Sequence, residues 1–228
     1  MDFNNIKTKI NLAKSYAAEC QAGARYQFMA TQAQLEKYTF IKDTMKMIAK
    51  NEMAHAKVFY DYILEKGGGN QEVTIEADYP YIDAKLNVSL KKESLVEKEE
   101  YEKIYPKFAE IAEKEGFKDI AESFKLITGV EKTHAKMLEY LEKHYSAKDI
   151  YKHPEKTVFK CSNCGHIAYQ TDGWKKCPLC SMDQGAIMID YGKIMENSLG
   201  LCSSACSSKD SKKSESKKGT GSSKSKKK

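Results

Sequence analysis

Residues 45–62 read MKMIAKNEMAHAKVFYDY, and this stretch decides the fold. Its apolar residues recur every three or four positions, which is the period of one face of an α-helix. Glu52 and His55 lie on that same face. Because a buried charge is costly unless it is paired or bound to a metal, the stretch predicts a core helix that carries metal ligands.

The stretch 124–141, FKLITGVEKTHAKMLEYL, repeats this pattern. Glu131 and His134 interrupt an apolar face with the same spacing of three. Residues three apart lie on one side of a helix, so each Glu/His pair can reach a single metal ion. One such motif in a chain rich in Glu is usually chance, whereas two of them on core faces indicate a site for two metals.

Four long helices are predicted, so the fold class is mainly α. They span Phe3–Lys37, Phe40–Lys66, Val88–Glu115 and Lys118–Tyr145. Short turns after the first and third helices predict antiparallel pairs, and the long segment between the second and third predicts a crossover, as in a four-helix ferritin-like bundle over residues 1–147. Pro106 should kink the third helix because proline lacks a backbone donor.

The other two helices are expected to supply further carboxylates, because ferritin-like di-metal sites take one Glu from each. On the first helix, Glu19 is the sole acid of the apolar face, and Gly23 is expected to leave space for a metal. On the third helix, Glu93, Glu97 and Glu100 all fit the buried face. Spacing alone does not choose among these three.

A separate small domain is predicted over residues 156–192, where the sequence becomes rich in Cys, Gly and aromatic residues. Two C-x₂-C pairs lie there, formed by Cys161, Cys164, Cys177 and Cys180. Two such pairs give four thiolates for one tetrahedral metal. Taken alone, the pattern favours structural zinc, since zinc ribbons share it.

The net charge of +6 comes from the C-terminal tail. Residues 207–228 hold nine lysines and two acids, a net +7, so the rest of the chain sums to −1. Residues 193–228 are predicted to be disordered, because a Ser/Lys/Gly tail cannot bury enough apolar surface to fold. The tail is most simply a solubilising appendage; the alternative is an electrostatic tether to nucleic acid or an acidic partner. We do not expect nucleic-acid binding.

Neither a signal peptide nor a membrane-spanning run is expected, because no long apolar stretch occurs. Paired cysteines in a chain without a secretion signal indicate metal binding, so the expected location is the reducing cytoplasm. No glycine-rich dinucleotide motif is present. Any electrons from NAD(P)H should therefore arrive through a separate protein.

The chain resembles the rubrerythrin family over about residues 3–192. The resemblance rests on Asn11-Leu12, Glu19-Cys20-Gln21-Ala22, Tyr26, Glu52-x-x-His55-Ala56-Lys57, Glu97-x-x-Glu100, Tyr105-Pro106-x-Phe108-Ala109, Glu113-x-Glu115-Gly116-Phe117, Glu131-x-x-His134 and the cysteine module. It selects Glu97 and Glu100 on the third helix. Glu93 is left as an acid in solvent or just outside the ligand set.

The resemblance implies a non-haem di-iron centre and a rubredoxin-like Fe(SCys)₄ iron in place of zinc. The implied di-iron ligands are Glu19, Glu52, His55, Glu97, Glu100, Glu131 and His134. Glu52 and Glu131 would bridge the irons, while His55 in the reduced form and Glu100 in the oxidised form would exchange as ligands. Tyr26 could hydrogen-bond a ligand carboxylate, although a plain core tyrosine fits equally well.

The implied activity is peroxidase: reduction of hydrogen peroxide to water in defence against oxidative stress. A separate donor, either rubredoxin or an NAD(P)H-dependent reductase, would supply electrons through the Cys₄ iron. The implied assembly is a head-to-tail homodimer. The alternatives are a ferroxidase that handles iron and a zinc-stabilised helical interaction protein.

Three residues depart from the family pattern. Ala18 and Val96 stand where the family often has Gly before a ligand Glu, and Cys20 stands where Ser is common. None of the three removes a ligand. The bulkier neighbours are expected to narrow the metal pocket.

Overall fold

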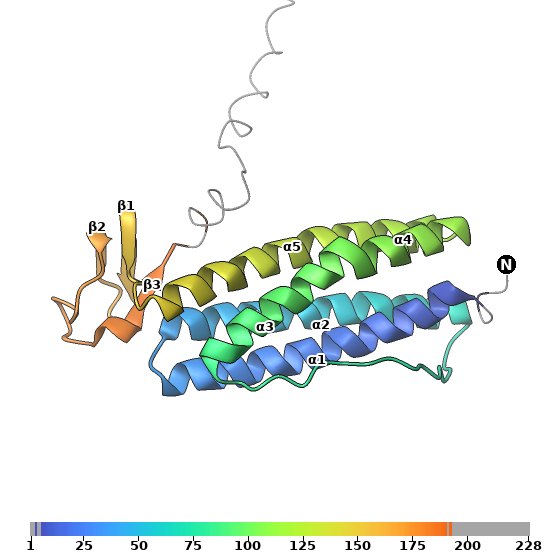
Figure 1. The fold of residues 1–228 in the computed structure, drawn as a ribbon, viewed down its shortest axis with the longest axis horizontal. Helices are drawn as coiled ribbons and strands as arrows, with labels where there is room; N and C mark the ends of the chain where they lie inside the picture. The colour runs from blue at the N-terminus through green and yellow to red at the C-terminus, as the bar shows by residue number, and fades with distance from the viewer. Residues whose placement is uncertain (1–2, 4–5, 191, 193–228) are drawn as a thin grey trace, which may run out of the picture.

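The computed structural model describes residues 3, 6–190 and 192 (Figure 1). The predicted tail over 193–228, with Cys202 and Cys206, lies outside them. The helical part consists of α1 (Lys7–Leu35), α2 (Thr39–Gly67), α3 (Leu86–Glu99), the π-helical segment η2 (Glu100–Ile104), α4 (Tyr105–Lys114) and α5 (Lys118–Ser146).

The helices form a bundle of two hairpins, which confirms the mainly α, ferritin-like fold class. One hairpin is α1 with α2; the other is the rod α3–η2–α4 with α5 (Figure 1). Residues 70–85 form an extended crossover that connects the two hairpins and runs beside α1 (Figure 1). The apolar faces meet inside the bundle, where Leu12, Ile48 and Phe124 are fully buried.

The third predicted helix differs from expectation at its centre. An unbroken helix with a kink at Pro106 was expected, but a π turn separates α3 from α4 just before this proline. A continuous α-helix would direct the proline ring into the preceding turn. The wider π turn relieves that clash and shifts the residues after it around the helix axis. Pro106 then stands in the first turn of α4, where its missing N–H is not needed.

Gly23 lies at the contact between α1 and α2. A Cβ atom built there would be 3.2 Å from Sδ of Met53 and 3.4 Å from the carbonyl oxygen of Ala49. Gly23 thus allows the two helices to approach closely. The expectation that it leaves space for a metal is wrong, because the nearest atoms belong to the facing helix.

The cysteine module is a three-stranded antiparallel sheet at one end of the bundle (Figure 1). Its strands are β1 (Lys152–Cys161), β2 (Ile167–Asp172) and β3 (Ile187–Ile189), in the order β2-β1-β3, with the short helix η3 (Gln184–Ala186) before β3. One apolar cluster continues from the bundle into the sheet. It includes Ala33, Phe40, Ile41 and Leu141 of the helices and Ile150, Tyr151, Phe159, Ile187 and Ile189 of the module.

No helix within the described ranges is both long enough and apolar enough to cross a membrane.

Candidate metal centres

Six buried acids and histidines meet in the middle of the bundle, from α1, α2, α3 and α5. They form two groups that share two members: Glu19, Glu52, His55 and Glu131, and Glu52, Glu97, Glu131 and His134. Within each group, one possible ligand atom per residue lies within 4.8 Å of the others. The shared members are Glu52 and Glu131, so their carboxylates stand between two potential metal positions.

Both imidazole rings turn the same atom towards the shared carboxylates. Nδ1 of His55 is 2.9 Å from a Glu131 oxygen and 3.1 Å from a Glu52 oxygen. Nδ1 of His134 is 2.8 Å from the other Glu131 oxygen and 2.9 Å from the other Glu52 oxygen. Nδ1 is therefore the ring atom that would bind a metal in each group.

Apart from one another, several buried polar atoms of this cluster have no hydrogen-bond partner among the described residues. They are Oε1 of Glu52, Oε2 of Glu97, both carboxylate oxygens of Glu131 and Nδ1 of His134. Buried polar atoms without partners are costly, and these atoms converge on one another. When ionised, the four clustered carboxylates carry four negative charges, which two divalent cations would balance. The donor set fits a di-iron centre.

The acids also favour positive charge at this place. Burial alone would lower the pKa of His55, but hydrogen bonds to the surrounding carboxylates, first Glu131, raise it to about 12. Burial would raise the pKa of Glu52, but hydrogen bonds from His134 and His55 lower it to about 2. A metal bound here would displace the protons that these rings otherwise hold.

Two buried tyrosines hold the carboxylates that are not shared. The Tyr26 hydroxyl donates a hydrogen bond to Glu97, and the Tyr105 hydroxyl donates one to Glu19. Burial, followed by the charge of the accepting carboxylate, raises the pKa of each tyrosine well above its usual value. Both hydroxyls therefore stay protonated and remain donors. The sequence suggested this role for Tyr26. Tyr105 was noted there only as part of the motif that resembles the family, with no role assigned to it.

Two further contacts were not predicted. The Asn51 side chain lies 3.2 Å from Nε2 of His134, on the side of the ring away from the carboxylates. Glu93 is buried and forms a bidentate pair with Arg25, with separations of 2.7 and 3.2 Å. Glu93 therefore stands just outside the clustered groups and is not a solvent-facing acid.

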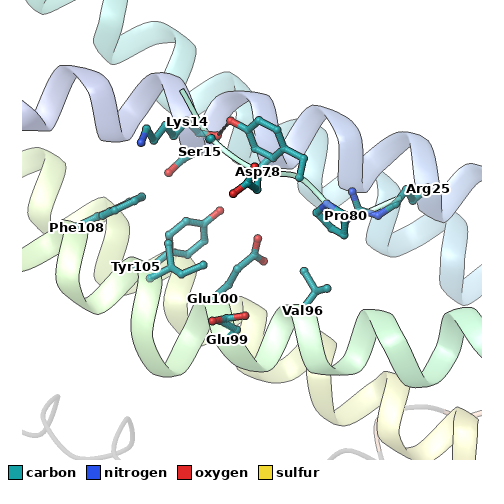
Figure 2. Close-up of a pocket in the computed structure, with 14 residues that line it drawn as sticks. Lys14, Ser15, Arg25, Asp78, Pro80, Val96, Glu99, Glu100, Tyr105 and Phe108 are labelled. Carbon is teal, nitrogen blue, oxygen red and sulfur yellow. Dashed lines mark hydrogen bonds between the residues drawn. The ribbon is translucent and has the colours of Figure 1, made fainter. Parts of the chain in front are cut away.

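Glu100 belongs to neither clustered group. It begins the π turn and lines a cavity with Tyr105, Val96 and Phe108 (Figure 2). Burial raises the pKa of Glu100 well above its usual value, and the negative charges of Glu97 and Glu19 raise it further. Its carboxyl group is thus within electrostatic reach of the cluster without joining it.

The four cysteines form the second site. The Sγ atoms of Cys161 and Cys180 are 3.7 Å apart, and those of Cys164 and Cys177 are 3.6 Å apart. A tetrahedral metal with bonds of about 2.3 Å to sulfur would separate its ligands by roughly 3.8 Å. All four Sγ atoms lie within 4.8 Å of one another, so the module offers a preformed S₄ site for one metal ion.

Comparison with known proteins agrees with this geometry. A family model described as Rubrerythrin matches residues 11–142. Rubrerythrin of Clostridium perfringens is 36% identical over 177 residues, which cover 76% of this chain and 89% of the relative. Rubrerythrin-1 of Clostridium acetobutylicum is 37% identical over 175 residues, with coverages of 76% and 89%.

Among solved structures, nigerythrin in its fully reduced, all-ferrous state superposes with a TM-score of 0.53 and 24% identity, over 82% of this chain and 91% of that one. At this identity the likeness shows the fold alone. The sequence relatives, the paired Glu/His groups and the four-cysteine site together lead to one conclusion. The chain belongs to the rubrerythrin family of di-iron oxidoreductases.

Proposed function

We propose that this chain reduces hydrogen peroxide to water at the Glu/His cluster and is re-reduced through the Cys₄ iron. The observation that carries the proposal is the presence, in one chain, of two ligand groups sharing Glu52 and Glu131 and of a four-thiolate site. The reaction consumes one peroxide, two electrons and two protons and releases two waters. When bound, two ferrous ions would supply the two electrons, one each.

In this proposal the clustered residues are the ligands. Glu52 and Glu131 would be shared by the two metal ions; Glu19 and His55 would complete one ligand set, and Glu97 and His134 the other. Tyr26 and Tyr105 hold the terminal carboxylates in place by hydrogen bonds. Burial of the cluster excludes bulk water and strengthens these interactions.

We further propose that His55 and Glu100 exchange as ligands with the redox state. In this structure the His55 ring faces the shared carboxylates, while Glu100 stands apart beside the cavity. In the proposed exchange, this arrangement would correspond to the reduced form. A ferric pair carries two more positive charges than a ferrous pair, so an anionic carboxylate then becomes the better partner than a neutral imidazole.

Electrons would enter through the Cys₄ site from a separate carrier, either rubredoxin or an NAD(P)H-dependent reductase. From His134, α5 continues for twelve residues to Ser146, about 18 Å, before the module begins. A head-to-tail homodimer would bring a partner's module closer to the cluster. Light scattering combined with an activity assay tests this dimer: a monomer that keeps full turnover would contradict it.

We place the protein in the reducing cytoplasm, where the thiols stay free to bind iron.

The ferroxidase alternative is less well supported, because iron storage has no need of a one-electron thiolate site in the same chain. The two activities differ in iron balance. A ferroxidase supplied with excess ferrous iron and oxygen accumulates ferric iron beyond its ligand capacity, whereas a peroxidase retains only its resident iron. A zinc-stabilised interaction protein would instead purify colourless and without iron.

The test of the proposal is stopped-flow mixing of anaerobically reduced, iron-loaded protein with hydrogen peroxide. We expect rapid oxidation with one peroxide consumed per cluster and no hydroxyl radical trapped. Glu100→Ala should slow turnover and leave the Cys₄ absorption intact. Glu102→Ala, an exposed acid of the same π turn, is the matched control and should behave like the parent. An unreactive reduced protein would reject the peroxidase assignment.

A further inference from the structure

A cavity of about 300 Å³ lies beside the di-iron cluster, between α1, the rod α3–η2–α4 and the crossover (Figure 2). Its walls are mostly apolar and include Ala18, Val96, Ile104 and Phe108. A water molecule occupies roughly 30 Å³ in the liquid, so the cavity has room for small polar molecules.

Two lining residues connect the cavity to the cluster. Tyr105, one of its lining residues, donates a hydrogen bond to Glu19 of the cluster. Glu100 is another lining residue, and its pKa is raised by burial and by the negative charges of the clustered carboxylates. These two side chains therefore link the wall of the cavity to the cluster.

Residues 77–80 of the crossover form one wall of the cavity. The Tyr79 hydroxyl donates a hydrogen bond to the carbonyl oxygen of Lys14, at 3.1 Å, which ties this wall to α1. This hydrogen bond therefore joins two walls of the cavity, the crossover and α1.

The two departures from the family pattern that precede ligands both line this cavity. Ala18 comes directly before Glu19 on α1, and Val96 comes directly before Glu97 on α3. Figure 2 shows Val96 and Glu100 projecting from the α3–η2 rod towards α1. A glycine at either position would leave the passage wider by the volume of the missing side chain.

We propose that this cavity is the entrance through which peroxide reaches the cluster, and that Ala18 and Val96 set its width. It would admit hydrogen peroxide and retard bulky organic hydroperoxides. An organic hydroperoxide needs the same two electrons and two protons and yields one alcohol and one water, so discrimination would come from access and not from the bond that is broken. This inference rests on the proposed peroxidase function.

The first test compares rates of single-turnover oxidation by hydrogen peroxide and by tert-butyl hydroperoxide. Val96→Ala should raise the ratio of the organic to the hydrogen peroxide rate by about tenfold, since a methylene or two in a pocket has effects of this size. Val96→Phe should slow both. Leu95→Phe, at an exposed position of the same helix, is the matched control and should change neither. A substrate ratio that is unchanged in both Val96 variants would overturn the proposal.

The second test needs no turnover, so it separates failure of the entrance from failure of the peroxidase function. In a Cys20→Ser background, Val96→Cys is labelled with methyl and benzyl methanethiosulfonate, and each peptide is quantified by mass spectrometry. We expect the methyl reagent to react at least about tenfold faster at position 96, because the passage limits size. Leu95→Cys should react equally with both. Equal rates at position 96, or no labelling there, would contradict the entrance.

Discussion

Asn51 fixes the orientation of a histidine that faces the di-metal cluster. A ring that binds metal through Nδ1 carries its proton on Nε2 and needs an acceptor there. The amide nitrogen of Asn51 lies 3.2 Å from Nε2 of His134, and a flip of the amide group would place its oxygen there as the acceptor of that proton. The Nε2 atom of His55 has no such hydrogen bond to any described residue. The two halves of the cluster are therefore supported unequally, which agrees with a proposed exchange at His55.

Asn51→Leu should weaken binding of the metal beside His134 by about 10–100-fold, because partners of ligand histidines have effects of this size. Asn51→Asp should preserve the affinity, since a carboxylate is also an acceptor. Calorimetric titration of metal-free protein with Co²⁺ measures both. Lys50→Leu, at an exposed position one residue away, serves as the control. An Asn51→Leu protein with the parent's affinity would show that the amide does not support the ligand.

The residues of the cluster differ in how far the sequence could predict them. Glu52 and Glu131 were predictable because each interrupts an otherwise apolar stripe, and the structure buries both. Asn51 was not, because it precedes Glu52 and so points about 100° away from the core stripe. Its contact with His134 exists only once α2 and α5 are packed together. Tyr105 was missed for the same reason, since its acceptor Glu19 lies on another helix.

The helix α1 begins without a cap of its own. Its N-cap residue Ile6 makes no side-chain hydrogen bond, so the first backbone donors need another partner. Glu115, at the end of α4, provides it by accepting hydrogen bonds from the backbone N–H groups of Lys7 and Thr8 at 3.1 and 2.8 Å. Partial burial would raise the pKa of Glu115, but the hydrogen bonds from Thr8 outweigh this and hold the pKa below its usual value.

Glu115→Gln should lower the free energy of unfolding by about 1 kcal/mol at pH 7, the usual size of a lost cap interaction. Because the pKa is lower in the folded than in the unfolded protein, the charged group stabilises the fold above its unfolded pKa. This contribution is lost as the pH falls through the folded pKa. Thermal unfolding at pH 7 and pH 4 should therefore show the two proteins converging at the lower pH. A constant difference would exclude a role for the charge.

At the level of helices and turns, too, local sequence patterns were predictable, whereas features that depend on tertiary packing were not. Helix periodicity and the lengths of the connecting segments were enough to predict the helices and their pairing. The π turn was not predictable, because Pro106 requires some distortion but its own position does not say which preceding turn will absorb it. The cap from Glu115 likewise depends on how α4 meets α1.

The bundle and the cysteine module share one apolar core, although the sequence suggests two separate domains. Composition changes sharply after Ser146, which predicts a separate module, yet one apolar cluster runs from Phe40 and Leu141 of the bundle to Phe159 and Ile187 of the sheet. Periodicity could not reveal this, since the apolar residues of a short strand do not specify what they pack against. The shared core holds the Cys₄ site at a fixed place on the end of the bundle.

Gly185 marks the tightest point of that contact. A Cβ atom there would lie 1.8 Å from the carbonyl oxygen of Lys37, in the turn between α1 and α2. The obstacle is backbone, which cannot rotate away as a side chain can. Any larger residue at this position must push the module off the bundle.

Gly185→Ala should therefore lower the free energy of unfolding by about 1–3 kcal/mol, the usual range for overpacking, and should speed amide exchange in β1 and β3. Gly129→Ala is the matched control: this exposed glycine of α5 has no neighbour within 4 Å, so alanine should stabilise the protein by up to about 1 kcal/mol through its higher helix propensity. Thermal unfolding measures the change in stability of both variants, and hydrogen exchange measures the opening of the sheet. If Gly185→Ala left exchange in the sheet unaltered, the module would not depend on this contact for its place on the bundle.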